Sequence, residues 1–217
     1  MISAIIFDLD GTLVDSSECI VQAAQFVRNK HSLRAVSSRD IRSKIGQPLD
    51  RMLSNLFDIK GPLLQQAITD YSTAYVQQAS TEEKLFPPTL SLLTKLRNAG
   101  FLLAIATGKS QHGAENASAR LGLTPYFDTI HGIVPGTPGK PDPAIIFRVM
   151  KALNVHPSQC LMVGDTTFDI DLAHAAGVHT IAVNWGVHSE QLLKSRKPKF
   201  FAKNFEELQH HLLQHSP

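Results

Sequence analysis

The sequence predicts an α/β protein with a doubly wound parallel sheet and an α-helical domain inserted into it. Short apolar runs bounded by turn residues recur along the chain, and such runs are typical of strands buried on both faces. Helical patterns separate most of these runs, and this alternation indicates βαβ units around a parallel sheet. The stretch after the first strand breaks the alternation, because it contains only helical patterns. We therefore expect a core interrupted by a group of helices.

The apolar runs give the expected strands in chain order, and amphipathic patterns give the helices between them. Strands are predicted at residues 4–7, 101–106, 129–133, 161–163, 180–183 and 200–202. Helices are predicted at residues 87–98, 114–121, 143–153, 168–176 and 205–213. Glycines follow three of these helices, at Gly100, Gly122 and Gly177, where left-handed caps favour glycine.

The inserted helical domain is predicted to follow the first strand. Apolar residues at helical spacing begin with Ile20 and continue to about residue 78. Polar segments at residues 15–17 and 80–83 are the expected hinges. The predicted domains are an α/β core of residues 1–15 and 84–217 and a helical domain of residues 16–83.

Composition argues against several classes of function. With 217 residues, 43% of them hydrophobic, the chain can bury a sizeable core. The net charge is +2 and charged residues make up 18% of the chain, so no charge bias indicates nucleic acid or a membrane surface. The two cysteines suggest no disulfide framework, and we find neither a signal peptide nor a membrane-spanning run. We expect a soluble, cytoplasmic protein.

Polar residues follow several predicted strands, and this placement predicts a ligand site. The carboxyl ends of parallel strands meet at one edge of a sheet, and ligands bind there. Taken singly, an Asp or Thr after a strand is more often a helix N-cap, and a Lys is more often a surface residue. Their common position at one edge favours a site instead. The residues placed there are Asp8, Asp10, Thr107, Gly108, Lys109, Asp165 and Asp169, with Lys140 in a further loop.

The residue types at this edge predict a metal ion and a phosphate. Clustered carboxylates raise one another's pKa unless a cation is present, and an all-oxygen ligand set favours Mg²⁺. A threonine and lysines beside the metal supply donors that suit a dianion. We therefore expect a small phosphorylated metabolite as the ligand.

Four motifs in this order resemble the haloacid dehalogenase superfamily of phosphohydrolases, and the resemblance spans essentially the whole chain. The motifs are Asp8-Leu9-Asp10-Gly11-Thr12, Thr107, Lys140-Pro141 and Gly164-Asp165-Thr166-Thr167-Phe168-Asp169. The helical insertion lies where this family carries a C1-type cap. The cap position and the Thr107-Gly108-Lys109 segment are most similar to the phosphoglycolate phosphatase-like subgroup, so phosphoglycolate is the expected substrate.

The resemblance implies a role for each motif residue. Asp8 would be the nucleophile that forms an aspartyl-phosphate, and Asp10 would be the general acid and base. Asp8, Asp10, Asp165 and Asp169 would hold Mg²⁺, Asp10 through its backbone carbonyl. The remaining residues implied are Thr107 and Lys140 for catalysis, and Thr12, Gly108, Lys109, Arg42 and Lys44 for substrate binding. The last two lie in the cap, in a loop at residues 42–47 that is expected to read the leaving group.

Other functions on related folds stay open. A β-phosphoglucomutase-like mutase usually has a Glu-Asp pair in the fourth motif, whereas Gly164-Asp165-Thr166 is the hydrolase form. A phosphonatase needs a cap lysine for a Schiff base, and Lys44 lies near the implied position. Outside the superfamily, a phospho-accepting receiver domain also gathers Asp, Thr, Lys and Mg²⁺, but it has no insertion after its first strand. No nucleic-acid or membrane partner is predicted, and the sequence is compatible with a monomer or a homodimer.

Overall fold

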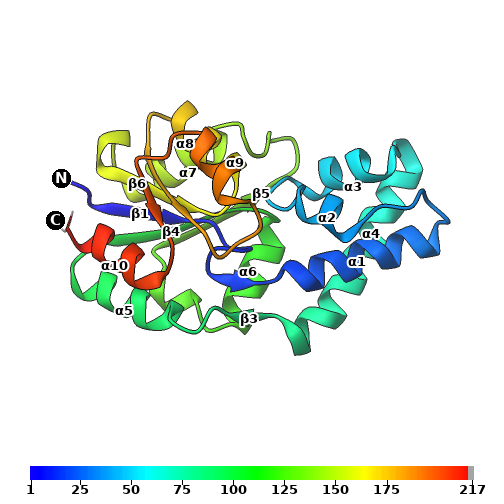
Figure 1. Ribbon diagram of the computed structural model, residues 1–217, viewed down its shortest axis with the longest axis horizontal. Helices are drawn as coiled ribbons and strands as arrows, with labels where there is room; N and C mark the ends of the chain where they lie inside the picture. Colours follow the sequence, from blue (N-terminus) through cyan, green and yellow to red (C-terminus); the bar gives the residue numbers. More distant parts are fainter. Residues whose placement is uncertain (215–217) are drawn as a thin grey trace.

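The computed structural model describes residues 1–214, and six parallel strands form its main sheet (Figure 1). In spatial order they are β5 (Thr129–Ile133), β4 (Leu102–Ser110), β1 (Ala4–Phe7), β6 (Cys160–Gly164), β7 (His179–Val183) and β8 (Phe200–Ala202). The chain builds outward from β1 in one direction and then in the other. The central strand is thus the first one, and the doubly wound sheet predicted from the sequence is confirmed.

Helices cover both faces of the sheet (Figure 1). Side chains alternate along β1, so that Ile5 and Phe7 pack in one apolar cluster while Ala4 and Ile6 pack in another. The Ile5 face is covered by α5 (Thr89–Asn98), α6 (Gln111–Arg120) and α10 (Phe205–Leu213). The Ala4 face is covered by α7 (Ala144–Leu153), α8 (Thr167–Ala175) and α9 (Glu190–Ser195).

Most predicted strands and helices are confirmed to within a few residues, with two notable differences. Strand β4 continues to Ser110 instead of ending at Ala106, and its pairing with β5 is irregular between these two residues. The sequence does not predict α9, because this helix is short and buries only Leu193, which is too little for an apolar stripe.

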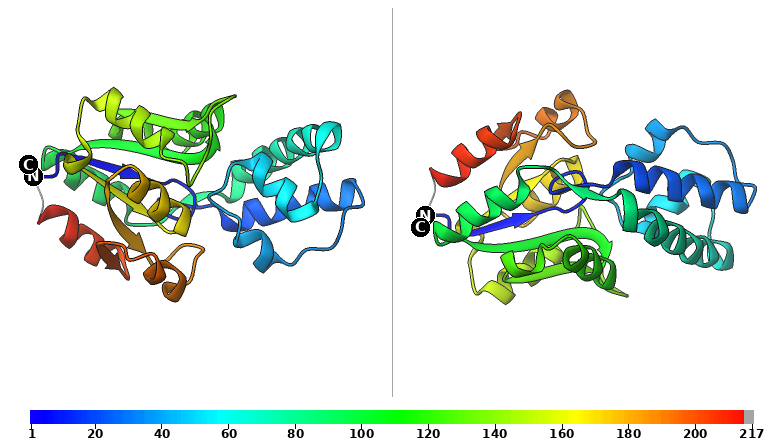
Figure 2. Two further views of the ribbon diagram at one scale, coloured as in Figure 1. Left: turned by 90° about the horizontal axis from the view of Figure 1, so that it is seen from above. Right: turned by 90° about the horizontal axis from the view of Figure 1, so that it is seen from below.

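Four helices form the helical insertion, which we define as residues 17–82. They are α1 (Ser17–Lys30), α2 (Ser38–Arg42), α3 (Leu49–Phe57) and α4 (Gly61–Glu82). Their apolar faces meet in a cluster of their own, which includes Val27, Leu53 and Tyr71. Figure 2 shows these helices grouped beyond the carboxyl end of β1, at one end of the molecule.

A short two-stranded ribbon connects the helical insertion to the sheet. Strands β2 (Val14–Asp15) and β3 (Lys84–Leu85) pair in antiparallel fashion, so the two chain crossings lie side by side. The second expected hinge is shorter than predicted, because residues 80–82 belong to the last turn of α4. No glycine or proline ends that helix before Glu83, and polar residues alone do not stop a helix.

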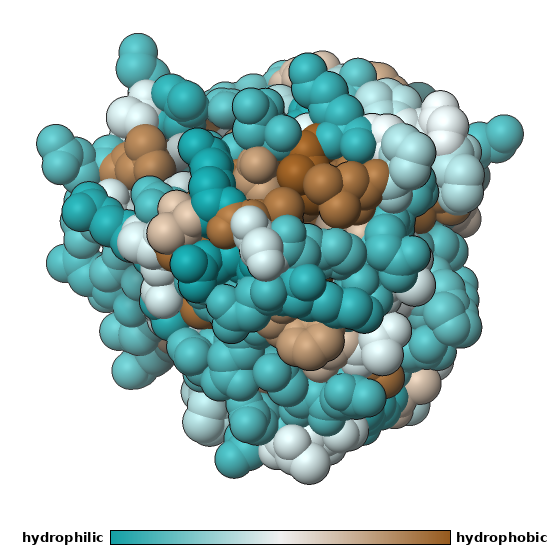
Figure 3. Space-filling view, turned by 90° about the vertical axis from the view of Figure 1, so that its right-hand side faces the viewer, coloured by the Kyte–Doolittle hydropathy of each residue, from teal (hydrophilic) through white to brown (hydrophobic). Residues whose placement is uncertain are grey.

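The exposed end of the helical insertion is mainly hydrophilic, with small apolar patches (Figure 3). The large apolar side chains exposed on this insertion are Phe26, Leu63 and Val76. Within residues 1–214, no helix combines the length and the apolar character that crossing a bilayer requires.

Candidate active site

The residues singled out at the strand ends come together at the carboxyl edge of the sheet. Strand β1 leads directly into Asp8, and β6 ends one residue before Asp165. Thr107 lies in the irregular end of β4, and Lys140 enters from the segment between β5 and α7. All four residues are buried. The sequence-predicted convergence is therefore present in the structure.

Three carboxylates form the centre of the site. One oxygen from each of Asp8, Asp165 and Asp169 lies within 4.8 Å of the others. The Oδ2 atom of Asp8 is buried and has no hydrogen-bond partner within residues 1–214. A buried carboxylate oxygen without a partner is costly unless a ligand completes it. This oxygen and the carboxylates around it therefore fit a small, hard cation such as Mg²⁺.

Lys140 supplies a positive charge within this centre. Its Nζ donates to Asp8 Oδ1 and to Asp169 Oδ1, both over 2.6 Å. Burial alone would lower the pKa of Lys140, but Asp169 and Asp8 outweigh burial and raise it, so the ammonium stays charged. One ammonium against three carboxylates leaves an excess of negative charge.

The crowding of the carboxylates shifts their protonation. Burial raises the pKa of Asp8 well above its ordinary value; Lys140 lowers it in part, and the nearby carboxylates raise it further. Burial, followed by Asp169, raises the pKa of Asp165 to about 7. A divalent cation would reverse this preference and release protons on binding. The charge distribution thus agrees with the predicted metal site.

Neighbouring hydrogen-bond donors orient the carboxylates of Asp165 and Asp169. Thr12 Oγ1 donates to Asp165 Oδ1 over 2.8 Å, and the Val187 amide donates to Asp165 Oδ2 over 2.8 Å. Asp169 Oδ2 accepts from the amide and the hydroxyl of Thr166, at 3.0 and 2.7 Å, in a capping box at the start of α8. Asp169 is therefore both a capping residue and a member of the carboxylate centre.

The Thr12 side chain contacts one of the three carboxylates. The resemblance implies that Thr12 binds substrate, but its side chain is fully buried and its hydroxyl is committed to Asp165. The indole N–H of Trp185 donates to the Thr12 carbonyl over 3.0 Å, and this hydrogen bond holds the Thr12 backbone in place. Thr12 is therefore placed to orient a carboxylate. The loop of Trp185 and Val187 follows β7 at the same edge, so the strand-end rule could have found it, although neither residue carries a chemical signal.

Asp10 lies beside the carboxylate centre and is held from two sides. Ser16 Oγ donates to Asp10 Oδ1 over 2.5 Å, and Lys109 Nζ lies 3.1 Å from the same oxygen. Asp10 is 7% exposed, compared with 1% for Asp8. A carboxyl group next to the centre but closer to its rim can exchange protons with a leaving group or with water.

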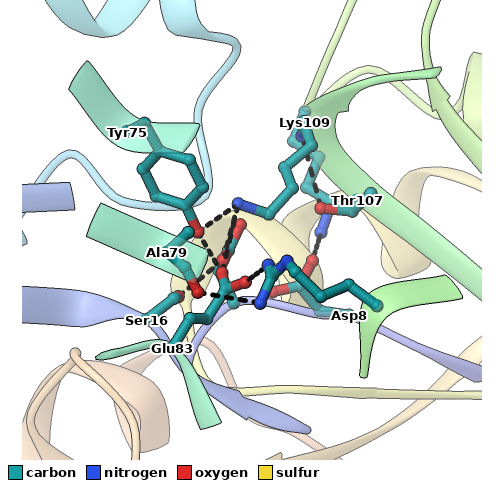
Figure 4. Close-up of polar contacts among 10 residues, drawn as sticks. Asp8, Ser16, Tyr75, Ala79, Glu83, Thr107 and Lys109 are labelled. Atoms are coloured by element: carbon teal, nitrogen blue, oxygen red, sulfur yellow. Dashed lines mark hydrogen bonds and ion pairs between the residues drawn. The ribbon is translucent and has the colours of Figure 1, made fainter. Parts of the chain in front are cut away.

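Lys109 contacts Asp10 and also Tyr75 of the helical insertion, and Figure 4 shows its ammonium directed at the Tyr75 hydroxyl. Its Nζ lies 2.8 Å from the Tyr75 hydroxyl, 4.1 Å from the centroid of that ring and 3.9 Å from Glu83 Oε1. The Tyr75 hydroxyl donates to Glu83, whose other oxygen accepts from Arg120. Lys109 is thus surrounded by protein groups instead of facing an open substrate pocket. A tyrosine on a helix and a glutamate in a polar hinge give no sequence signal, so neither is predicted.

The loop at residues 42–47 touches the core at Gly46. A Cβ atom at Gly46, where φ is +97°, would lie 3.1 Å from Thr166 Oγ1. A Cβ atom at Gly108 would come within 2.7 Å of the Gly46 carbonyl oxygen. Only glycines allow this approach between the helical insertion and the strand-end loops. Gly108 therefore lies at the site and directly beneath the loop at residues 42–47.

The two charged residues of this loop are placed differently. Arg42 donates to Glu18 over 2.7 Å in a partly exposed ion pair, so its expected contact with substrate is not supported. Burial lowers the pKa of His188, and the positive charge of Lys44 adds to this effect. His188 accepts a hydrogen bond from the Thr167 amide at the start of α8. The charge of Lys44 therefore acts on a residue beside the strand-end loops, whereas Arg42 pairs with Glu18 of α1.

Comparisons with known proteins find relatives along nearly the whole chain. A family model described as haloacid dehalogenase-like hydrolase matches residues 5–183. The chain is 28% identical over 207 residues to the putative pyrophosphatase PpaX of Caldanaerobacter subterraneus subsp. tengcongensis, which covers 95% of this chain and 93% of that protein. It is 32% identical over 208 residues to the probable phosphatase IndB of Dickeya dadantii, with coverages of 94% and 90%. The crystal structure of a predicted phosphatase from Clostridium acetobutylicum is 26% identical, with a TM-score of 0.89 over 99% of both chains.

Proposed function

The chain belongs to the haloacid dehalogenase-like hydrolase family, and on this premise we propose that it is a Mg²⁺-dependent phosphatase that forms an aspartyl-phosphate on Asp8. The observation that carries the proposal is the state of the Asp8 carboxylate. Lys140 holds its Oδ1, while its buried Oδ2 has no partner within residues 1–214. A carboxylate fixed at one oxygen and free at the other is oriented for attack on phosphorus.

We propose that Asp8, Asp165 and the backbone carbonyl of Asp10 hold the metal. When bound, Mg²⁺ offsets the repulsion between the anionic nucleophile and the anionic phosphate. Asp169 adds charge beside them, and its two oxygens already accept from Lys140 and Thr166. This arrangement favours a role for Asp169 in orienting Lys140 over direct binding of the metal.

The proposed reaction has two steps. In the first step an oxygen of Asp8 attacks phosphorus, the bond from phosphorus to the ester oxygen breaks, and Asp10 gives its proton to the leaving oxygen. In the second step Asp10 takes a proton from water, the water oxygen attacks phosphorus, and the bond to Asp8 breaks. Asp8 is then a carboxylate again and Asp10 is protonated again. Thr107, the Gly108 amide and Lys140 bind the phosphoryl oxygens in both steps.

We propose that the helical insertion is a cap that opens for substrate and closes for reaction. Asp8, Thr107 and Lys140 are at most 1% exposed, so a substrate can reach them only after the insertion moves. The close packing of Gly46 on Gly108 favours a small leaving group. Phosphoglycolate is the first candidate substrate, from the resemblance of the motifs. Pyrophosphate is the second, because a relative that matches nearly the whole chain bears the name pyrophosphatase.

The experiment that tests this proposal is Mg²⁺-dependent hydrolysis of p-nitrophenyl phosphate by the wild type and by Asp8→Asn. We expect multiple turnovers that stop in the presence of a chelator, and no turnover by the variant, whose fold should be retained. Asp171→Asn is a matched control, because Asp171 lies in a partly exposed ion pair with Arg196, and it should retain full activity. Activity in Asp8→Asn, or turnover that persists in chelator, would refute the proposal. A panel of phosphorylated metabolites ranked by kcat/KM would then identify the substrate.

A further inference from the structure

Lys109 carries a nearly buried positive charge that the two proposed steps do not use. Its side chain is 13% exposed, and its Nζ lies between the Asp10 carboxylate and the Tyr75 hydroxyl, at 3.1 and 2.8 Å. The Tyr75 ring covers it at 4.1 Å, and Glu83 lies 3.9 Å away. A buried ammonium with partners on several sides is fixed in position, and it fixes its partners in turn.

We propose that Lys109 is a positioning residue for Asp10, and that Tyr75 of the helical insertion and Glu83, which directly follows it, hold Lys109 in place for this task. The inference rests on the proposed function, because it concerns the acid–base step of that reaction. It replaces the substrate-binding role that the resemblance implies for Lys109.

Charge balance favours this role over binding of a substrate anion. Glu83, whose side chain is fully buried, ion-pairs with Arg120 and lies 3.9 Å from Lys109. When Asp10 gives its proton to the leaving oxygen, it becomes a second carboxylate beside Lys109, whose Nζ lies 3.1 Å away. A substrate anion bound to Lys109 would compete for this counter-charge and leave the newly ionised Asp10 poorly compensated, which is costly away from water.

Both ends of the helical insertion converge on Asp10. Ser16, which directly precedes α1, donates to the Asp10 carboxylate at the first crossing. Near the second crossing, Tyr75 and Glu83 contact Lys109 (Figure 4). The Lys109 Nζ in turn lies 3.1 Å from the same Asp10 oxygen.

Arg120 fixes the second crossing to the core. It donates to the Ala79 carbonyl over 2.8 Å and also to Glu83, so the last turns of α4 are attached to α6. Movement of the helical insertion would therefore disturb the groups around Asp10. Asp8 and Lys140 both belong to the core, so the hydrogen bond between them does not depend on a residue of the insertion.

The test compares two aryl phosphates that differ little in size but strongly in leaving group. Phenyl phosphate needs a proton on its leaving oxygen, whereas p-nitrophenyl phosphate does not, and kcat/KM reports the step in which that oxygen leaves. For Lys109→Met we expect the ratio of kcat/KM for phenyl phosphate to that for p-nitrophenyl phosphate to fall about tenfold, because a misplaced acid loses part of the roughly 10²- to 10⁴-fold that proton transfer contributes.

Two milder variants test the same inference by changing the partners of Lys109 instead of Lys109 itself. Tyr75→Phe removes a single oxygen and Glu83→Gln removes a charge, and both should lower the same ratio by about threefold, which is less than the loss at Lys109. Lys194→Met is the matched control, because Lys194 lies in an exposed ion pair with Glu190. It should leave kcat/KM unchanged for both aryl phosphates. If Lys109→Met does not fold, Tyr75→Phe decides the question alone.

Three results separate the possible failures. Equal losses for both aryl phosphates in Lys109→Met and in Tyr75→Phe would overturn the inference and indicate a structural role. A loss confined to an ester whose alcohol carries a carboxylate, such as phosphoglycolate, would also overturn it and return Lys109 to substrate binding. Absence of turnover in the wild type with every phosphate ester would refute the proposed function itself, a result distinct from the other two.

Discussion

Two roles for Thr12 lead to different predictions: the structure places its hydroxyl against Asp165, whereas the sequence motif implies that it binds substrate. Thr12→Val removes the hydroxyl that donates to Asp165 Oδ1 over 2.8 Å and otherwise keeps the shape of the side chain. A hydrogen bond to a charged group contributes roughly 1.5–3 kcal/mol, and the partner oxygen would be left buried without it. If about 2 kcal/mol of this is lost from metal binding, the Mg²⁺ concentration for half-maximal activity should rise about 30-fold.

The assay is a Mg²⁺ titration of p-nitrophenyl phosphate hydrolysis, followed by a substrate titration at saturating Mg²⁺. We expect the half-saturating Mg²⁺ concentration to rise while KM for the substrate stays within about twofold of wild type. Trp185, the only tryptophan in the chain, donates to the Thr12 carbonyl, so its fluorescence offers a second measure of metal binding.

Thr180→Val is the matched control, because Thr180 is equally buried but its hydroxyl has no partner within residues 1–214. It should leave the Mg²⁺ titration unchanged. An unaltered Mg²⁺ titration in Thr12→Val, with a raised KM for substrate, would refute the reasoning and support the substrate-binding role that the motif implies.

Three further predictions follow from the charges of the site. Burial raises the pKa of Asp165 from 3.8 to about 7, so between these pH values the folded metal-free protein retains a proton that the unfolded chain releases, and its stability falls as the pH rises. The gain in Tm from Mg²⁺ should therefore be larger at about pH 8 than at about pH 5. Equal gains at the two pH values would contradict the shift. Lys140→Met should abolish activity, and it should lower the free energy of unfolding at neutral pH by about 3–5 kcal/mol because Asp8 and Asp169 stay buried without their counter-charge. Urea titrations measure this change, and an unchanged midpoint would show that the ion pair does not stabilise the fold. Arg42→Ala removes only a partly exposed ion pair, so KM should change less than about twofold, whereas a tenfold rise would restore the contact with substrate expected from the sequence.

Strand positions and the carboxylate centre could be predicted because their signals are local. A buried parallel strand is a short apolar run, and Asp8 and Asp10 follow such a run directly, so their position at the sheet edge follows from the sheet topology. The same rule places Asp165 and Asp169 after β6. Each of these residues can therefore be assigned from the apolar run before it and the expectation of a parallel sheet.

The groups that support the site could not be predicted, because their partners are distant in the sequence. Thr12 and Asp165 are 153 positions apart, and Tyr75 and Lys109 are 34 apart. Arg42 and Lys44 are similar residues two positions apart, yet Arg42 pairs with Glu18 whereas the charge of Lys44 acts on His188. Which way such side chains point depends on how the helical insertion packs on the sheet, and residue spacing alone does not determine that packing.

The most direct measurement of the central claim is to locate the phosphoryl group during turnover. The enzyme would be mixed with Mg²⁺ and p-nitrophenyl phosphate, quenched in acid within the first turnover, and digested for peptide mass spectrometry. We predict a hydroxylamine-sensitive phosphate on the peptide that contains Asp8, at the side chain whose Oδ2 is free in the structure, and none in Asp8→Asn. Rapid turnover with Asp8 unmodified, or a phosphate found on another side chain, would contradict the account.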